Sequence, residues 1–453
     1  MTEWAAEELA WVRLKDKRHQ SRLVRIVERL AERPAVSIPA ACQNWAETKG
    51  AYRFFGSGRV DAEAIRLGHQ AKTLERMQGK EWVIVAQDSS ELNFTGRHNL
   101  QGLGGLRKKG EQGLYLHSGL AISIEGVPLG LLYQHMWARE IRSERTKYER
   151  QSTPTKNKES QRWIDTLQVC QQAIPEETYA IIVADREADR YDLLVTPRRS
   201  RTHLLIRAVQ NRRINHSLIY LQEAVRSQPL AGIVPIEVQR QVERPSRNAL
   251  LEVRYLTVEI TPPLRGLKRK GAQPISVQVV LAQEMLPPAG EEAICWWLLT
   301  TLPVQNFAEA KSVLHYYAYR WLIERYHFVL KSGCHIEELQ MESSERLERA
   351  LATYSIVAWR LLWLTYLARQ SPSQSCEIAF EPSEWQSLYC TVHNTPIPPQ
   401  HPPSLQNAMV WVAHLGGFLG RKGDGEPGVK TIWRGLRRLS DISATWSLLH
   451  PYP

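Results

Sequence analysis

The first sixty residues carry the apolar spacing of short helices. Between Arg13 and Arg33, apolar side chains recur three and four residues apart, while Lys and Arg crowd the remaining positions. The apolar positions are Leu23, Ile26, Val27 and Leu30. We expect Pro34 to end this basic amphipathic helix and a second short helix to follow it. The pattern predicts a small helical module over residues 1–62, whose basic face either is merely solvated or contacts DNA.

Two short runs of β-branched and apolar residues predict buried strands. The first covers residues 82–86 and is followed closely by Asp88, and the second covers residues 179–184 and is followed directly by Asp185. Open α/β sheets bind their ligands beyond the carboxyl ends of their strands. The two aspartates therefore mark a candidate site at one edge of a sheet.

Other segments extend the β pattern. Residues 120–124 and 129–133 predict a hairpin that turns at a Glu-Gly pair. Residues 251–260 alternate between apolar and polar as a strand does, and residues 296–300 form another short apolar run. A Pro-rich run over residues 396–403 predicts a linker before the C-terminal segment.

The composition excludes some classes of protein and favours one kind of partner. Hydrophobic residues make up 43% of the 453 positions, which excludes wholesale disorder. The net charge of +11 favours an anionic partner, nucleic acid first and an anionic membrane surface second, and a merely basic enzyme is the alternative. Most of this charge lies in residues 198–270, which contain fifteen Lys and Arg, five Glu and no Asp, a net charge of +10. We expect a basic, β-rich insertion there.

Cysteine usage and the apolar runs indicate a cytoplasmic location. The six cysteines are scattered without a Cys-x-x-Cys pair, so neither a zinc finger nor a disulfide framework is expected. The N-terminus lacks the basic start of a signal peptide. The most apolar helical stretch, residues 355–368, is short and contains Arg360, so we expect no membrane span.

A long helix predicted from about Phe307 to Lys331 carries polar residues that could take part in binding or catalysis. At about 100° per residue, four of them project from one stripe about 60° wide. These residues are Tyr317, Arg320, Glu324 and Lys331. Such a stripe is often a solvated, salt-bridged face. Together with Asp88 and Asp185, however, Glu324 makes three hard oxygen donors, which suit Mg²⁺ or Mn²⁺ beside a phosphate backbone.

These residues resemble the DDE transposases of the insertion-sequence-four family. The resemblance rests on Asp88, the Asp185–Asp189 string and the Tyr-Arg-Glu-Lys spacing over 317–331. Further similar segments lie at 50–54, 296–301 and 416–430, so the resemblance covers nearly the whole chain. It implies an RNase H-like α/β catalytic core with a β-rich insertion, flanked by a helical N-terminal DNA-binding domain and a helical C-terminal domain.

The resemblance also implies a division into domains. We expect the DNA-binding domain over residues 1–62, the catalytic domain over 63–375 with its basic insertion at about 190–290, and a C-terminal domain over 376–453. The C-terminal domain is the candidate for dimerisation, because two transposon ends must be brought together by a homodimer in the synaptic complex. The chain ends soon after residues 446–450, so we expect it to lack the long terminal helix that pairs protomers.

By matching position, the resemblance makes Asp88, Asp185 and Glu324 the catalytic residues and the ligands of two Mg²⁺ ions, with Mn²⁺ as a substitute. One strand of double-stranded DNA would be cut at the transposon end. The freed 3′-hydroxyl would then close a hairpin, which is reopened before the ends join target DNA. The neighbouring Glu187, Asp189 and Asp192 are interpreted as helix-start or surface carboxylates.

Several residues are candidates for DNA contacts. Trp296 aligns with a family residue that stacks on a flipped-out base, and we interpret it as that base platform; the alternative is that Trp296 or Trp297 packs in the core. Arg207 matches a family position that is expected to contact DNA. The candidates for phosphate contacts are Tyr317, Arg320 and Lys331 near the catalytic site, and Arg22, Arg25, Arg29 and Arg53 in the N-terminal module.

Two alternatives to a cut-and-paste transposase stay open. One is a catalytically inactive repressor that occupies transposon ends, against which the three intact carboxylates argue. The other is an RNase H-like DNA nuclease that cuts without strand transfer. For the transposase we expect a bacterial, cytoplasmic and nucleoid-associated protein without a membrane partner.

Overall fold

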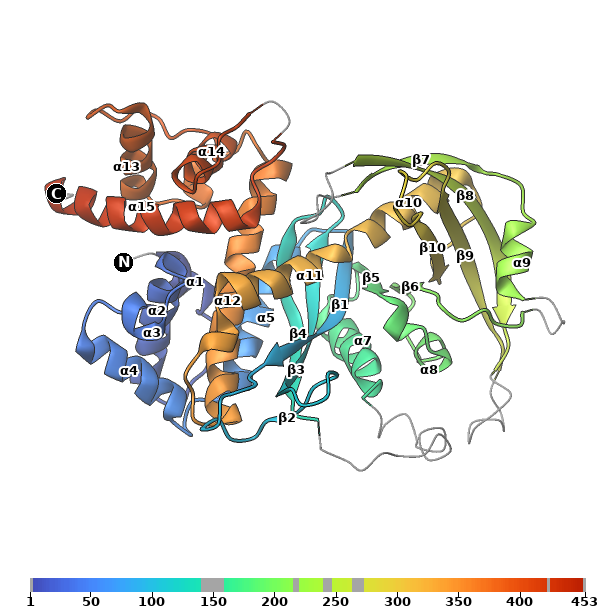
Figure 1. Ribbon diagram of the computed structural model, residues 1–453, viewed down its shortest axis with the longest axis horizontal. Coiled ribbons are helices and arrows are strands. Elements are labelled where there is room, and N and C mark those ends of the chain that lie inside the picture. The colour runs from blue at the N-terminus through green and yellow to red at the C-terminus, as the bar shows by residue number, and fades with distance from the viewer. Residues whose placement is uncertain are drawn as a thin grey trace. The chain divides into compact units, whose positions relative to one another are not determined.

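The computed structural model describes residues 3–139, 159–214, 220–238, 247–262, 273–421 and 424–450 (Figure 1). The chain divides into two compact units. Unit 1 comprises Met1–Gln78, Ser89–Ile141 and Leu322–Pro453, and unit 2 comprises Gly79–Asp88 and Arg142–Trp321.

The N-terminal part of unit 1 is helical, as predicted. Its helices are α1 (Glu3–Glu8), α2 (Lys17–Glu32), α3 (Ile38–Ala41), α4 (Trp45–Gly56) and α5 (Ala62–Met77). Helix α2 starts where the Asp16 carboxylate accepts the Arg18 backbone N–H, and it buries the four apolar residues that the sequence spacing selects. The predicted amphipathic helix is therefore confirmed.

Unit 1 also contains β-strands. They are β2 (Gly104–Gly105), β3 (Gln112–Ser123), β4 (Pro128–Trp137) and the second half of β1 (Trp82–Asn93), which neighbours β3. The β3–β4 pair is the predicted hairpin, and its turn contains Gly126 at φ 95°, a left-handed conformation that suits glycine. Helices α5 and α12 (Ser344–Gln370) pack against β4.

Helix α12 is the central helix of unit 1. By length and composition it could cross a membrane, but 83% of its most apolar window is buried inside the protein. Burial of that kind is what the core helix of a globular domain shows, and it makes α12 weak evidence for a membrane span.

The C-terminal helices of unit 1 share one hydrophobic core. They are α13 (Pro382–His393), α14 (Leu405–Leu415) and α15 (Val429–Leu449), preceded by the short η5 (Cys376–Ile378). Trp385, Met409 and Ile432 contribute one buried side chain from each of the three longer helices. The last of these helices, α15, has 21 residues.

Unit 2 contains a mixed sheet. The first half of β1, β5 (Tyr179–Ala184) and β6 (Thr202–Arg207) are parallel. The order then continues through four antiparallel strands: β10 (Cys295–Thr300), β9 (Ile275–Glu284), β8 (Arg247–Ile260) and β7 (Gly232–Val238). Residues 180–184 of β5 are fully buried, as is typical of a parallel strand covered on both faces.

Unit 2 also contains helices. They are α7 (Gln161–Ala173), α8 (Tyr191–Leu194), α9 (Leu221–Arg226) and α10 (Phe307–Ala318), with the short η2 (Arg186–Ala188) after β5. Parallel strands, a β-rich segment after β6 and helical segments at both ends of the chain confirm the predicted α/β fold class. The arrangement is consistent with an RNase H-like core.

A buried polar network holds α1 to the rest of unit 1. The Glu8 carboxylate lies 2.6 Å from Nδ1 of His69 and 2.7 Å from a guanidinium nitrogen of Arg76. Nε2 of His69 accepts the Leu131 backbone N–H at 3.0 Å, so the imidazole is neutral and donates from Nδ1 to Glu8. Burial raises the pKa of Glu8, but His69 and Arg76 outweigh it and bring that pKa to about 2. Burial lowers the pKa of His69.

We expect Glu8→Gln to lower the free energy of unfolding by about 3 kcal/mol, because it leaves Arg76 without its buried partner. The network should also make stability pH-dependent. The His69 contribution is complete above pH 6.5 and is lost as the pH falls below that value. The Glu8 contribution is complete above pH 4.5 and is lost as the pH falls toward 2. Urea unfolding at several pH values measures both effects. Glu7→Gln, at an exposed neighbour, is the control, and equal stability of the two variants would contradict the role of Glu8.

Candidate active site and DNA-binding surface

The parallel pairing of β1 and β5 in unit 2 brings two aspartates together. The register pairs Gln87 with Ala184, so the next residues along the strands, Asp88 and Asp185, lie side by side. Neighbouring strands are about 4.8 Å apart, and residues paired in a parallel sheet point to the same face. Both side chains are half-buried. Two carboxylates in this arrangement provide the hard oxygen ligands that Mg²⁺ and Mn²⁺ prefer.

The two aspartates differ in their local structure. Asp185 follows β5, and its side chain accepts the Glu187 backbone N–H at 2.8 Å to start η2. Asp88 lies inside β1, which continues to Asn93, so the predicted strand end at residue 86 is wrong. Burial raises the pKa of Asp185 and the charge of Glu187 adds to this, while the Glu187 N–H and the charge of Arg320 oppose it.

An aromatic and cationic cluster lies on the same unit as the aspartates. Tyr317 on α10 is 4% exposed, and its ring meets the half-buried Trp296 edge-on at 5.1 Å. The Arg320 guanidinium lies 5.8 Å from the centre of the Tyr317 ring. Burial raises the pKa of the Tyr317 phenol, whereas Arg320 and Arg207 lower it and Asp185 raises it further. The charges of Asp185 and of both arginines therefore act on this tyrosine.

The two adjacent tryptophans of β10 have different environments. Trp297 is 8% exposed, with the Arg226 guanidinium 5.3 Å from its ring centre, and so it is the core residue of the pair. Trp296 points to the other face of the strand and is only half-buried. Arg207 on β6 donates to the Cys295 carbonyl at 3.2 Å, beside Trp296. Of the two tryptophans, Trp296 is therefore the one available to a ligand.

The predicted helix from Phe307 to Lys331 is interrupted. After α10, the N–H groups of Tyr319 and Arg320 bond three residues back instead of four. Helix α11 (Trp321–Phe328) follows, and it widens into a π-helical turn, η3 (Val329–Gly333). The single regular stripe drawn from the sequence is therefore wrong, because a tightened turn and a widened turn change the angle per residue.

Glu324 and Lys331 belong to unit 1. Glu324 lies on α11 with an exposed side chain. The Lys331 ammonium donates to the Glu91 carbonyl at 2.8 Å and pairs with Glu337 at 3.2 Å. Glu337 also accepts the Asn93 backbone N–H at 2.7 Å, so η3 is attached to the last residues of β1.

The three predicted metal ligands are thus divided between the units. Asp88 and Asp185 lie in unit 2, and Glu324 lies in unit 1. Over the described residues, no group of three or more His, Cys, Asp or Glu side chains could hold a metal ion. The paired aspartates fit a divalent cation by their chemistry, and the complete three-carboxylate site stays a prediction from the sequence.

The N-terminal helices present basic side chains of two kinds. Arg22 and Arg25 on α2, like Arg53 on α4, are exposed. Arg22 lines a cleft of about 450 Å³ together with Arg18, His19 and Arg59. Arg29, in contrast, pairs with Glu32 at 3.2 Å and with Glu47 at 3.4 Å. Phosphates are therefore more accessible to the three exposed arginines than to Arg29.

Three family models match the chain. The model described as Transposase DNA-binding matches residues 1–60, Transposase DDE domain matches residues 146–360, and Transposase Tn5 dimerisation domain matches residues 356–445. The chain carries the domains of a DDE transposase.

The matches assign roles to parts of this transposase. The DNA-binding match covers α1 to α4, including the exposed arginines of α2 and α4. The DDE match contains Asp185 and Glu324 but begins after Asp88. The dimerisation match contains α13, α14 and most of α15, so the C-terminal helices belong to a dimerisation domain.

Sequence reasoning misjudged one acidic residue of the transposase. Asp189, interpreted as a helix-start or surface carboxylate, is 2% exposed and pairs with Arg212 at 2.5 Å. It also accepts the backbone N–H groups of Val209 and Gln210, at 2.7 and 2.9 Å. Asp189 thus anchors the chain after β6 to the turn that carries Asp185. Its position four residues after Asp185 was the only available signal.

Proposed function

We propose that this transposase is a metal-dependent cut-and-paste enzyme of the insertion-sequence-four family. The observation that carries the proposal is the side-by-side placement of Asp88 and Asp185, each directly after the last paired residue of the parallel β1–β5 ladder. Phosphoryl transfer without a protein nucleophile requires hard oxygen ligands held in this way. The Tyr-Arg-Glu-Lys spacing over 317–331 supports the same assignment.

The three predicted carboxylates and two of the predicted cations have roles in this chemistry. Asp88, Asp185 and Glu324 would hold two Mg²⁺ ions. When bound, these ions would activate the attacking water or 3′-hydroxyl and stabilise the departing oxygen. Arg320 and Lys331 would neutralise phosphates beside the scissile bond.

The reaction would proceed in steps that each exchange one phosphodiester bond. Water would first cut one strand at the transposon end, releasing a 3′-hydroxyl. That hydroxyl would attack the opposite strand to form a hairpin and release the flanking DNA. A second water would reopen the hairpin, and the 3′-end would then join a target phosphate. Trp296 would hold the base that a tight hairpin leaves unstacked.

The proposed partners are DNA and a second copy of the chain. Transposon ends would lie on the N-terminal helices through Arg22, Arg25 and Arg53, and the synaptic complex would be a homodimer formed through the C-terminal domain. We place the protein in the bacterial cytoplasm, associated with the nucleoid, because its substrate is there.

A strand-transfer assay tests this function. Inverted repeats identified in the DNA that flanks the gene would supply the end sequence, and the purified protein is incubated with precut ends, plasmid target and Mg²⁺. We expect joined products, their loss on chelation with EDTA, and their return with Mn²⁺. Cleavage of uncut ends without joining would favour the nuclease, and binding of ends without any cleavage would favour the repressor.

A further inference from the structure

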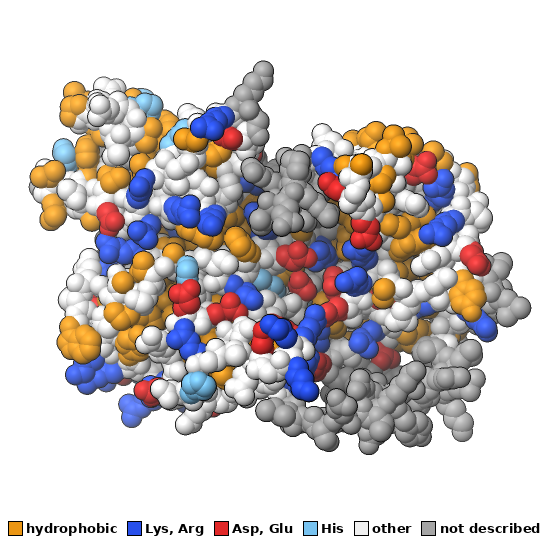
Figure 2. All heavy atoms as spheres, viewed as in Figure 1, with side chains coloured by type: hydrophobic (Ala, Val, Ile, Leu, Met, Phe, Trp, Pro, Cys, Tyr) orange, Lys and Arg blue, Asp and Glu red, His pale blue; other side chains and the backbone are white. Residues whose placement is uncertain are grey.

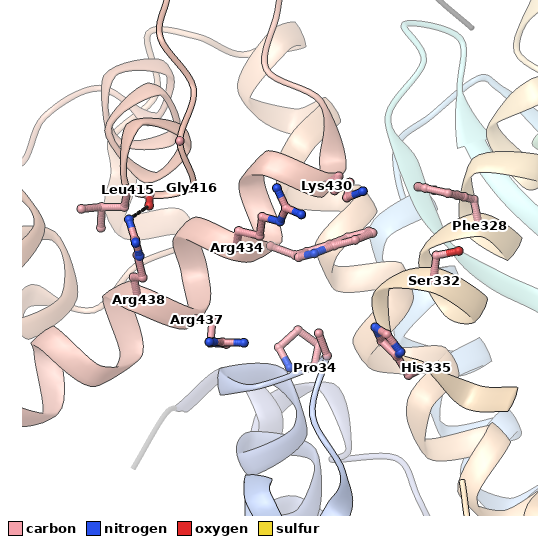
Figure 3. A pocket seen from close by; sticks show the side chains of 13 residues that line it. Pro34, Phe328, Ser332, His335, Leu415, Gly416, Lys430, Arg434, Arg437 and Arg438 are labelled. Atoms are coloured by element: carbon pink, nitrogen blue, oxygen red, sulfur yellow. Dashed lines mark hydrogen bonds between the residues drawn. The ribbon is translucent and has the colours of Figure 1, made fainter. Parts of the chain in front are cut away.

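A cleft in unit 1 is lined by basic residues that the functions above do not use. It lies between α15, the η3 turn and the residues that follow α2, and its volume is about 740 Å³ (Figure 3). We call it the α15 cleft. Its lining includes Pro34, Phe328, His335, Trp433, Arg434 and Arg437.

The charge of the α15 cleft is strongly positive. Lys430, Arg434, Arg437 and Arg438 line it from one helix at spacings of four, three and one, and all four are exposed. Figure 2 shows Lys and Arg side chains gathered over α15. No Asp or Glu is among the described residues that line it. Like charges four residues apart destabilise a helix by a few tenths of a kcal/mol, roughly, so an anion bound here would relieve repulsion.

Most of these cations lack an ion pair within the described part of the chain. Lys430, Arg434 and Arg437 have no carboxylate partner there, and Arg438 donates to the Leu415 carbonyl at 2.7 Å. The one acidic residue of α15, Asp441, pairs instead with Arg33. His335 on the opposite wall is bonded to Glu338 at 2.6 Å. The cations of α15 in this cleft are therefore available to an anion from outside the chain.

The floor of the α15 cleft is aromatic. The Trp433 side chain is 6% exposed and that of Phe328 is 38% exposed, with ring centres 6.0 Å apart. A Cβ on Gly333 would lie 2.8 Å from the Trp433 ring, so glycine is needed for this close approach. Flat apolar rings beside guanidinium groups suit the sugars and bases of a nucleic acid, whereas a free inorganic ion would use only the charges.

We propose that the α15 cleft binds the phosphate backbone of DNA. The inference rests on the proposed function, which makes DNA the ligand. A neighbouring segment supports it: Pro34, in the lining, follows the α2 helix with its exposed Arg22 and Arg25. Figure 3 shows Arg437 extending toward Pro34, with Ser332 and His335 on the opposite wall. DNA in the α15 cleft would contact α15 and the segment that follows α2 at the same time.

Salt-dependent DNA binding by the full-length protein tests the proposal. Arg434→Gln, Arg437→Gln and the double variant are titrated onto a labelled duplex by fluorescence anisotropy at several salt concentrations. Each lost phosphate contact should make the slope of log K against log salt shallower by about 0.9. At about 0.1 M salt, that corresponds to roughly 8-fold weaker binding for each substitution and roughly 60-fold for the double variant.

Two controls separate charge at the cleft from other effects. Lys80→Gln removes one charge just before the amino end of β1, about 25 Å along the strand direction from Asp88, and should leave the slope unchanged. Arg434→Lys with Arg437→Lys retains both charges and should retain the slope. Thermal unfolding checks that the glutamine variants are folded.

The outcomes distinguish this inference from the proposed function. If the wild type binds DNA with a steep slope and the double glutamine variant has the same slope, the cleft proposal is overturned and the transposase function stands. If the wild type does not bind DNA, both the cleft proposal and the proposed function are overturned. If the double variant instead weakens self-association of the DNA-free protein and leaves the slope intact, the cleft receives an acidic segment of a second copy, and the DNA proposal is overturned.

Discussion

Asp88→Ala should reduce cleavage of transposon ends by about 10³-fold or more, because it removes half of the paired carboxylates that would hold the catalytic ions. Losing one preorganised electrostatic group at a reaction centre has an effect of about this size. Binding of end DNA should persist, since the exposed arginines of α2 and α4 are untouched. Gel-based cleavage and anisotropy with the same duplex measure the two properties separately.

A matched variant shows whether the position or merely the charge matters. Glu81→Ala removes an exposed carboxylate just before the opposite end of β1 and should leave cleavage unchanged. Titration with Mn²⁺ provides a readout independent of turnover: the affinity should fall in the Asp88→Ala protein and stay the same in Glu81→Ala. Cleavage by Asp88→Ala at the wild-type rate would refute the metal role of this residue.

The pairing of these aspartates could be predicted from the sequence, because it depends on short-range patterns. Residues 82–86 and 179–184 are apolar runs of the length of a buried strand, and an acid follows each. The extent of β1 could not be predicted in the same way. Its second half is polar, and it stays extended because it neighbours β3 in unit 1, a contact made by residues distant in the sequence.

The prediction of one regular helix after Phe307 was wrong for a related reason. A period of 3.6 residues assumes one regular element with one buried face. The chain here leaves unit 2 at Trp321 and enters unit 1 at Leu322, so Tyr317 and Leu322 are buried in different units. The tightened turn at residues 319–320 and the π-helical turn of η3 occur on either side of this crossing. Which unit buries a residue is set by tertiary packing, and single-sequence periodicity does not contain it.

The sequence alone also does not show which basic residues are available to bind DNA. The sequence count places a net +10 in residues 198–270, but Arg212 is used to hold the buried Asp189 and Arg247 to hold the buried Glu284. Conversely, Lys430, Arg434 and Arg437 of α15, which have no ion pair among the described residues, lie outside that stretch. A cation held by a carboxylate is less available to phosphate, so the number of basic residues and the number that can bind DNA are different quantities.

Trp296→Ala should slow hairpin formation by about 5- to 150-fold, the equivalent of the 1–3 kcal/mol that an aromatic platform contributes to stacking one base. First-strand nicking should keep nearly its wild-type rate, because no base needs to leave the duplex in that step. Quenched-flow sampling on denaturing gels resolves nick and hairpin in one experiment. Trp296→Phe retains an aromatic face and should recover most of the hairpin rate.

The neighbouring tryptophan makes the comparison decisive. Trp297→Ala removes a buried side chain of the same strand and should lower the free energy of unfolding by about 3–5 kcal/mol, with both reaction steps failing together as the fold weakens. A specific loss of hairpins therefore separates a base platform from a core residue, since only the first leaves nicking and thermal stability intact. Equal slowing of nick and hairpin in Trp296→Ala would assign Trp296 to the packing around Tyr317, which its ring already contacts edge-on at 5.1 Å.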